Sequence, residues 1–556
     1  MRPFDRSFDA SFGGPVRGTG QPVDYVYICE LYPWQGSVNA TYGAPRPYDV
    51  YPADSLPDGE EQPPGEVVPL YYSDRAYLTA PDDVEAARRS YEGRLQGFSV
   101  ERRIPISPAD GARAAASYGT LTLRNDDGAL DAMPDSYAIA NRRVVVRRMI
   151  RGDYLAHAMT VFNGVGVAWE PGKSTMSVNV RDRTALAELP LLPLYGGGGG
   201  KDGPAEWAGR PVPACFGIVR WLPLFFYDTA YGLARVHFRR IHDVTGLWDK
   251  GGAYTFVDDY ATETALKAAS LSGGEFATCI AEGIVRAVPS GSDFAGQVTA
   301  TVLGDAEGGY VDTHAEIAQR ILDLAGLSSI TDASYFADLA ETYPGPAGFA
   351  WTDQTTYADA VSSVLGGIGA WWSDDREGSI ICGRLQAPPD ETDISLAKSD
   401  IIDLEPTPIP SSVSPAVWRV TVNYQRCRSV TNRNQLLDSA DEAIKAFAER
   451  EWRTSTPAED TGILIRFPAA PELKIDSGFD EKADADALAA HLLTLYPPGR
   501  VAFAQKVPLA VASSLYPGKT ERLTWPRHNL QSGRSLVVTA LPEDISDRTA
   551  TVIAWG

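Results

Sequence analysis

The run of glycines near residue 200 comes closest to a known chemical motif. Gly196–Gly200 precede Lys201, as glycines precede the lysine of a phosphate-binding P-loop. That motif also needs glycine where Tyr195 stands and a magnesium-binding Ser or Thr where Asp202 stands. An aspartate at that place would repel phosphate. The pattern therefore disfavours nucleotide binding and favours a mobile loop.

A second oxygen-rich segment, Asn125–Gly128, resembles part of a calcium-binding loop. In such a loop the first ligand position would fall on Leu123 and the twelfth on Pro134. Neither side chain can bind calcium, so the coordination sphere is incomplete. The segment is predicted to be a turn, since Asn, Asp and Gly are the residues that turns favour.

The histidines offer one local group, formed by His237, His242 and Asp243. The two histidines are 5 residues apart. This spacing suits neither one face of a strand nor a helical HExxH zinc motif. We therefore predict a pair of histidines in a loop or at a strand end, and no metal site.

The cysteines are few and widely separated, at positions Cys29, Cys215, Cys279, Cys382 and Cys427. None has the CxxC spacing of a zinc site or a redox motif, so buried free thiols are expected. There is no GxSxG nucleophile elbow and no local Cys/His arrangement. Among 72 acidic residues, some pair of carboxylates always looks like a glycosidase pair, so none is selected. We predict no catalytic, cofactor-binding or metal-binding residues, and no cofactor.

The composition excludes several classes of function. With 556 residues the chain can bury several cores, and its net charge of −22 disfavours sequence-specific nucleic-acid binding, which needs clustered Lys and Arg. No window approaches the roughly 18 apolar residues of a membrane span. Met1–Gly20 lacks the apolar core of a secretory signal. The chain is expected to stay in the cytosol or to leave it by cell lysis.

The clearest structural pattern lies in Ser117–Asp131. Alternation places Leu121 and Leu123 on one face of a strand, Asn125–Gly128 forms the turn, and Leu130 points back to a core. Further strands are predicted at 67–72, 143–149, 160–169, 174–180, 297–303, 371–372, 380–385, 417–424, 536–541 and 549–555. Residues 160–169 and 174–180 are expected to form a hairpin.

Four helices are predicted between these strands. Thr313–Glu316 is a capping box, and Thr356–Asp359 caps a second helix. The other two are expected from Ser439 past Trp452 and from Asp484 to Tyr496. The proline-rich stretch Glu405–Pro415 is predicted to be a linker.

The predicted fold class is mainly β (β-rich α+β), with several small barrel- or sandwich-like domains and a few short helices. The predicted division is a Pro/Tyr-rich extended arm at 1–66, a first β domain at 67–185, a β domain with the Gly-rich loop at 186–305, an α+β domain at 306–405, and a C-terminal β domain with two helices at 416–556.

An ordered series of short segments resembles tail-tip and baseplate hub proteins of long-tailed bacteriophages and gene-transfer particles. The segments are Tyr72–Arg75, Tyr91–Leu95, Glu101–Ile104, Gly119–Asp131, Asn141–Val144, Val161–Gly164, Arg181–Arg183, Pro193–Tyr195 with the glycines, Gly209–Pro213, Gly369–Trp372 before Arg376, and Gly533–Gly556. Residues 1–65 are less typical of these proteins. The resemblance covers most of the chain, and its specificity lies in the order of the segments.

The resemblance implies a non-enzymatic virion protein whose small β-barrel domains assemble as a homotrimer. Such a hub closes the tail tube, anchors distal tail parts and opens for DNA delivery. The implied partners are the distal tail protein, the tape measure and the receptor-binding or fibre proteins, with DNA passing through the lumen without sequence-specific binding. The implied location is the distal end of the virion tail, after assembly in the bacterial cytoplasm. Alternatives are a tail-associated cell-wall hydrolase and a carbohydrate- or receptor-binding tail protein.

Overall fold

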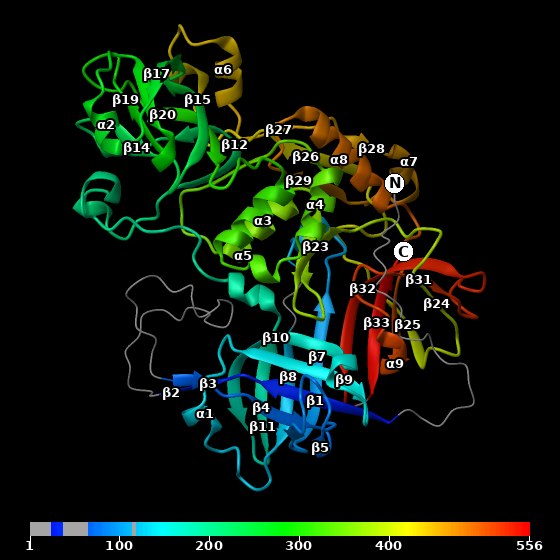
Figure 1. Ribbon diagram of the computed structural model, residues 1–556. Coiled ribbons are helices and arrows are strands. Elements are labelled where there is room, and N and C mark those ends of the chain that lie inside the picture. The colour runs from blue at the N-terminus through cyan, green and yellow to red at the C-terminus, as the bar shows by residue number, and fades with distance from the viewer. Residues whose placement is uncertain (1–23, 37–64, 114–117, 547) are drawn as a thin grey trace.

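Strands make up most of the regular structure of this chain. The computed structural model describes residues 24–36, 65–113, 118–546 and 548–556, and its ribbon shows several sheets with short helices between them (Figure 1). The longest helix of the described residues, α8 (Lys482–Leu495), has 14 residues. The prediction of a mainly β, β-rich α+β fold with a few short helices is confirmed.

The largest sheet has 13 strands and joins the beginning of the chain to its end. Its main path runs through β25 (Asp403–Thr407), β30 (Ala502–Pro508), β33 (Thr549–Trp555), β32 (Arg534–Asp544), β7 (Leu95–Arg103), β8 (Tyr118–Arg124), β11 (Thr175–Arg181), β10 (Met159–Pro171), β9 (Arg143–Ile150), β1 (Tyr25–Leu31) and β4 (Leu70–Ser73), while β31 (Thr520–Leu523) pairs with β32 and with β24 (Ile394–Leu396). The N-terminal and C-terminal strands meet where β32 pairs antiparallel with β7. The red and blue-to-cyan strands in Figure 1 lie side by side for this reason.

The N-terminal strands of this sheet curl until they nearly close a ring. β4, at the end of the path, reaches the residues just before β7, where Tyr72 pairs with Glu92. The Ser73 N–H donates to the Glu92 carbonyl at 2.8 Å. Closure of this kind leaves few free backbone groups at the edges.

The interior of the ring is built by the alternation expected from the sequence. Leu121 and Leu123 on β8 are both 0% exposed, and Leu130 after the turn is 3% exposed. They pack in one apolar cluster with residues from β9, β11 and the C-terminal strands. The predicted strand, turn and returning leucine are confirmed.

The hairpin predicted at 160–169 and 174–180 is also confirmed, and the two strands predicted at the end of the chain pair with each other. β10 and β11 pair antiparallel, and so do β32 and β33. Part of the predicted N-terminal arm belongs to the same sheet, because β1 pairs with β4 on one side and with β9 on the other. The other residues of the arm, 1–23 and 37–64, lie outside the described residues.

The middle of the chain forms two five-stranded sheets, drawn in green in Figure 1. One contains β16 (Gly252–Ala253), β15 (Ile241–Asp249), β20 (Val298–Asp305), β12 (Ala214–Pro223) and β21 (Gly348–Trp351); the other contains β13 (Phe226–Asp228), β14 (Leu233–Arg235), β19 (Ile284–Ala287), β18 (Glu275–Cys279) and β17 (Thr255–Asp259). A four-stranded sheet follows, with β26 (Arg419–Tyr424), β27 (Arg453–Thr454), β28 (Ala458–Glu459) and β29 (Glu472–Asp476). The shorter elements are β2 (Trp34–Gly36), β3 (Gly65–Val67), β5 (Tyr77–Leu78), β6 (Ser90–Tyr91), α1 (Met133–Ser136), α2 (Glu263–Ala268), α7 (Thr461–Arg466) and α9 (Leu509–Ala512).

The central helices begin where the sequence predicts. In α3 (His314–Leu324) the Thr313 side chain and Glu316 form both halves of the capping box, and in α5 (Tyr357–Gly366) the Thr356 hydroxyl accepts from the Asp359 N–H. Together with α4 (Ala333–Thr342) and α8, they bury their apolar faces in one cluster. That cluster includes Trp372 on the hairpin of β22 (Ala370–Asp374) and β23 (Ile380–Arg384), which is also confirmed.

Two local predictions are wrong. The helix predicted to continue past Trp452 is α6 (Glu442–Ala448), which ends earlier because Arg453 and Thr454 pair with β26. Tertiary pairing here overrides local helix propensity. The first residues of the predicted linker Glu405–Pro415 belong to β25, where Pro406 is tolerated because this strand is at the sheet edge.

The domain limits predicted at 1–66, 67–185, 186–305, 306–405 and 416–556 remain predictions. Strands from 67–185 and from 416–556 belong to one sheet, and the helical layer lies between them in sequence.

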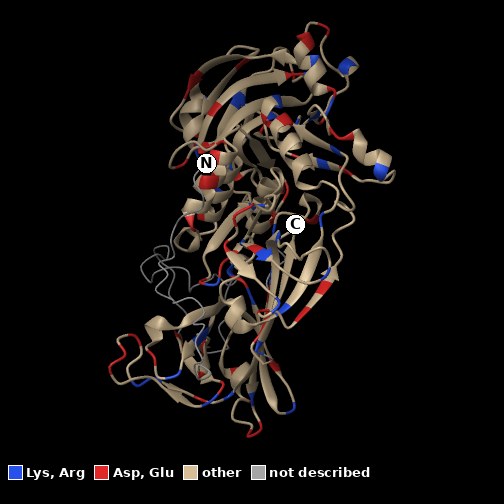
Figure 2. Cartoon of the chain, turned by 90° about the vertical axis from the view of Figure 1, so that its right-hand side faces the viewer, with Lys and Arg blue, Asp and Glu red and all other residues tan. Residues whose placement is uncertain are grey.

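Charges of both signs are interspersed along the chain (Figure 2). Within the described residues, no helix is long and apolar enough to cross a membrane.

Candidate functional site

The Gly-rich loop forms an anion-binding cup that the chain fills itself. The N–H groups of Gly196 and Gly198 donate to the two carboxylate oxygens of Asp202 at 2.8 and 2.9 Å. These backbone hydrogen bonds lower the pKa of Asp202. Gly197 and Gly199 adopt φ values of 78° and 86°, which explains why glycine is used there. The aspartate that argued against nucleotide binding thus occupies the place where a phosphate would sit.

The turn at Asn125–Gly128 is held by hydrogen bonds and an ion pair. The Asn125 side chain accepts from the Leu130 N–H at 2.8 Å. The Asp127 carboxylate receives two hydrogen bonds from the Arg94 guanidinium, at 2.8 and 2.7 Å, and these hydrogen bonds lower its pKa. The predicted turn is confirmed. Throughout the described ranges, no group of three or more His, Cys, Asp or Glu side chains is placed to hold a metal ion.

The two predicted histidines lie in different surroundings. His242 is on β15 and stacks on Tyr310, with ring centroids 4.5 Å apart. His237 lies in the loop after β14 and is 0% exposed. Its Nδ1 accepts from the Cys215 N–H at 3.1 Å. Nε2 therefore carries the proton and donates a hydrogen bond to Asp305 at 3.0 Å.

Cys215, His237 and Asp305 have the residue types of a nucleophilic triad, but their contacts do not form one. His237 binds the backbone N–H of Cys215, while the thiol donates to the Val236 carbonyl at 3.2 Å. Burial raises the pKa of the Cys215 thiol to about 12, which opposes thiolate formation. Asp305 also accepts from Arg239 and Arg320, so its carboxylate is engaged in ion pairs. This arrangement ties β12, β20 and α3 together.

A second buried cluster lies where the large sheet meets the central helical layer. Glu543 on β32 accepts from Arg102 on β7 and from Arg376 in the β22–β23 turn, each at 2.9 Å. Arg102 also donates to the Val161 carbonyl, and Arg376 to the Ser513 carbonyl, both at 2.8 Å. Glu543 and its two arginines therefore connect five separate segments of the chain. Burial lowers the pKa of Arg376, against the attraction of Glu543.

Two aspartates beside this cluster are the pair that most resembles catalytic carboxylates. Asp182 and Asp374 are 1% and 2% exposed. Burial raises the pKa of Asp374 well above its ordinary value, and the nearby Asp182 charge raises it further. Because neither side chain reaches solvent, a polymeric glycan could not contact them.

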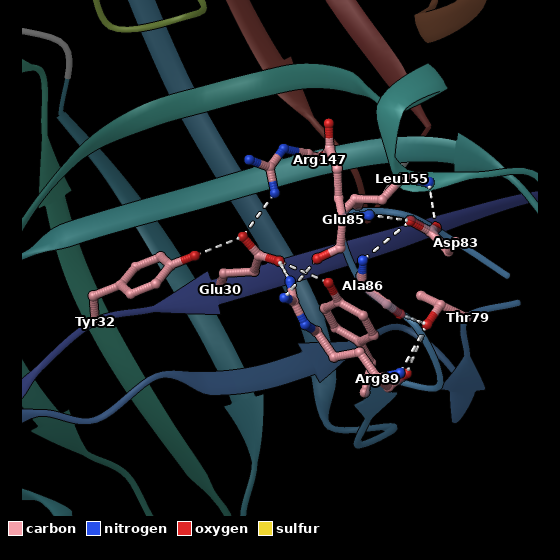
Figure 3. Close-up of polar contacts among 10 residues, drawn as sticks. Glu30, Tyr32, Thr79, Asp83, Glu85, Ala86, Arg89, Arg147 and Leu155 are labelled. Atoms are coloured by element: carbon pink, nitrogen blue, oxygen red, sulfur yellow. Dashed lines mark hydrogen bonds and ion pairs between the residues drawn. The ribbon is translucent and has the colours of Figure 1, made fainter. Parts of the chain in front are cut away.

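A third cluster surrounds Glu30 on β1 (Figure 3). One of its oxygens accepts from Tyr91 at 2.6 Å and Arg89 at 3.2 Å, and the other from Tyr32 at 2.9 Å and Arg147 at 2.7 Å. Burial raises the pKa of Glu30, but the Arg147 charge and these hydrogen bonds outweigh it and leave the pKa lowered. With two donors on each oxygen, the carboxylate is not available as a base. It fixes β1 to β9 and to the segment before β7.

These three clusters are the charged sites that sequence reasoning missed. Glu30 stands alone among apolar neighbours in Tyr25–Leu31, and such an isolated acidic residue is a sequence signal. Asp305 is the last residue of β20 and Glu543 is followed by Asp544, so neither carries this signal. Their arginine partners come from distant parts of the sequence and carry no local signal.

No protein-family model matches the chain, and no curated protein matches it. The chain is similar to phage-type tail proteins of known structure. The tail protein from Neisseria meningitidis MC58 is 10% identical over 83% of this chain and 92% of that chain, with a TM-score of 0.37. The 43 kDa tail protein of prophage MuSo2 from Shewanella oneidensis is 10% identical over 84% and 93%, with a TM-score of 0.35. A chain of the native gene transfer agent virion is 13% identical over 62% and 84%, with a TM-score of 0.41. Since these TM-scores lie below 0.5, we argue the function from the chain's own residues.

Proposed function

We propose that this chain is a structural virion protein that forms the tail-tip or baseplate hub of a phage-type tail. It closes the tail tube, anchors distal tail parts and opens for DNA delivery. The role is non-enzymatic and belongs to the distal end of the tail, after assembly in the bacterial cytoplasm. The partners are the distal tail protein, the tape measure and the receptor-binding or fibre proteins.

One observation carries this proposal: most of the segments that resemble hub proteins in sequence lie in one sheet. Glu101–Ile104, Gly119–Asp131 and Val161–Gly164 lie on or next to β7, β8 and β10, and Gly533–Gly556 supplies β32 and β33. β33, β32, β7 and β8 are consecutive on the path of the 13-stranded sheet, and β10 follows them after β11. The resemblance therefore follows mainly one structural unit, with Pro193–Tyr195, Gly209–Pro213 and Gly369–Trp372 outside it.

The same sheet supports a ring-shaped assembly. Its N-terminal strands curl into a nearly closed ring, and its C-terminal strands form a second set joined to the first at β7 and β32. Two such sets in each of three copies give six units around an axis, the arrangement that the resemblance to hub proteins implies beneath a sixfold tail tube. The homotrimer is part of the proposal. A net charge of −22 suits a channel through which DNA slides without sticking.

The proposal is tested by immunogold electron microscopy of particles shed by the producing bacteria, using antibody against this chain. Label at the tail end distal to the head is expected, and particles from a strain lacking the gene provide the control. Light scattering of the purified chain, coupled to size-exclusion chromatography, is expected to give the mass of a trimer. Unlabelled particles would refute the virion role, whereas a stable monomer would refute the trimer alone.

A further inference from the structure

The loop between β5 and β6, residues 79–89, is held rigid by its own side chains (Figure 3). Asp83 is 2% exposed, and one of its oxygens accepts from the N–H groups of Glu85 and Ala86 at 2.9 and 3.1 Å. The Thr79 hydroxyl donates to the Ala86 carbonyl and accepts from the Arg89 N–H at 2.8 Å. The loop has one conformation set by these bonds, although only the short pair β5 and β6 flanks it.

The loop is also tied to the large sheet at two places. The second oxygen of Asp83 accepts from the Leu155 N–H at 2.7 Å, in the segment after β9. Arg89 pairs with Glu30 on β1 at 3.2 Å, which connects the loop to the buried cluster described above. The ordering of this loop is thus supported by two buried carboxylates, Asp83 and Glu30.

This scaffold presents several apolar side chains to solvent. Val84, the residue after Asp83, is 100% exposed, and Leu78 at the start of the loop is 61% exposed. Tyr154 and Ile150, on the segment against which the loop packs, are 40% and 48% exposed. Ordering a loop costs conformational entropy, and Val84 offsets none of this cost by burial within this chain. Exposed apolar groups on an ordered support are typical of a protein interface.

The charged residues that flank Val84 in the loop are acidic, whereas Arg151 in the supporting segment is an exposed cation. Asp82 accepts from the Tyr154 hydroxyl at 2.8 Å, Glu85 is exposed beside Val84, and Asp153 lies at the base. Arg88 is the exposed cation of the loop. Because the chain as a whole carries −22, a second copy would meet this rim with like charge. A partner with Lys or Arg around an apolar pocket is complementary to it.

We propose that the tip of the 79–89 loop, with Val84 at its centre, docks into an apolar pocket rimmed by Lys and Arg on a different protein of the particle. The inference rests on the proposed virion function, because it needs a fixed neighbour. Val84 fills the pocket, and Asp82 and Glu85 pair with the basic rim. The buried Asp83 and Glu30 keep the loop in the docking conformation.

The native cysteines make a direct test possible, since all five are buried and free. The Val84→Cys variant is modified with a thiol-reactive benzophenone and assembled into particles, which are then irradiated. The matched control is Ile465→Cys on α7, where the native side chain is 88% exposed. The expected result is one discrete adduct, identified by mass spectrometry as a different virion protein, formed from Val84→Cys and not from Ile465→Cys.

Adding Asp82→Lys and Glu85→Lys to the Val84→Cys variant is expected to reduce this adduct about tenfold at low salt, as loss of rim attraction predicts. An adduct between two copies of this chain, no adduct in particles that contain the variant, or equal adducts at both positions would overturn the inference while leaving the virion role intact. Absence of the wild-type chain from the particles would instead refute the proposed function and, with it, the neighbour that the tip needs.

Discussion

The carboxyl group of Glu521 lies inside the C-terminal part of the large sheet, where it should make stability depend on pH. Glu521 on β31 and Gln505 on β30 are both 0% exposed, and the Gln505 amide donates to one oxygen of Glu521. The other Glu521 oxygen and the Gln505 carbonyl oxygen have no hydrogen-bond partner among the described residues. A proton on Glu521 would supply the missing donor and allow the acid and the amide to form two reciprocal hydrogen bonds.

No other charge is placed to replace that proton. Lys506 and Arg522 are exposed, since they neighbour inward-facing residues in their strands and point to the opposite face. The paired residues Ile394 on β24 and Leu536 on β32 are apolar. On the nearby strands, the ionisable residues Asp403 and Glu405 of β25 are exposed. Arg534 lies at one end of β32, and Glu543 and Asp544 lie at the other. β33 has no ionisable residue. His528 contacts the group only indirectly, through Phe503.

The size of the effect follows from the pKa. Burial raises the pKa of Glu521 from 4.5 to about 7, against the Gln505 hydrogen bond, which lowers it. One pKa unit corresponds to about 1.4 kcal/mol, so the folded state should lose about 3 kcal/mol between acidic and alkaline pH. Since the folded pKa is the higher one, this contribution is fully present below pH 4.5 and is lost as the pH rises through 7. Glu521→Gln keeps a neutral partner for Gln505 and should remove the loss.

Hydrogen–deuterium exchange of peptides from β30 and β31 measures this locally, after correction for the intrinsic pH dependence of exchange. Between pH 5 and 8.5 the free energy of opening should fall by about 2.5 kcal/mol in the wild-type chain, because part of the loss precedes pH 5, and stay nearly constant in Glu521→Gln. Glu405→Gln, at an exposed position on β25, is the matched control and should behave as wild type. Equal pH dependence in wild type and Glu521→Gln would refute the reasoning.

Three further predictions concern the Glu543 cluster, the core of the large sheet and the Gly-rich loop. Glu543→Ala leaves Arg102 and Arg376 buried without their shared carboxylate and should lower the free energy of unfolding by about 3–5 kcal/mol in urea titrations; a loss no larger than that of an exposed Glu405→Ala control would contradict it. Leu123→Ala empties a fully buried site on β8 and should cost about 2–5 kcal/mol in the same assay, whereas Thr122→Ala on the other face should cost far less; equal losses would show that the alternation does not define the core. Asp202→Gly removes the carboxylate that fills the Gly-rich cup and should speed protease cleavage within 196–203 with little change in melting temperature; unchanged cleavage would show that the cup does not depend on Asp202.

Local patterns were sufficient for the elements whose residues carry their own signal. The strand before Asn125 and the caps at Thr313 and Thr356 follow from alternation and from side chains that satisfy nearby backbone groups. The prediction of a helix past Trp452 is wrong because Arg453 pairs with β26, and a pairing between residues far apart in sequence leaves no local signal. The same holds for the join of β7 to β32, whose residues are separated by most of the chain.

For the candidate site, the sequence predicted only what the Gly-rich segment does not do, which is to bind a nucleotide. The Asp202 substitution in the Gly-rich motif is visible in the sequence, and the structure adds that this carboxylate fills the cup. The buried clusters were not predictable, because Glu30, Asp305 and Glu543 each depend on arginines brought in by folding. A carboxylate in a strand is unremarkable until the opposite side chains are known.

These clusters also determine how the net charge is divided between paired side chains and the rest of the chain. Glu30, Asp305 and Glu543 each pair with two arginines: Arg89 and Arg147, Arg239 and Arg320, and Arg102 and Arg376. Each cluster therefore holds more positive than negative charge at neutral pH, in side chains that are largely withdrawn from solvent. Since the whole chain carries −22, the residues outside these clusters carry a charge more negative than that value. In the proposed hub, the arginines that join distant strands are paired with buried carboxylates, while the net charge of −22 disfavours adhesion of the DNA that must pass.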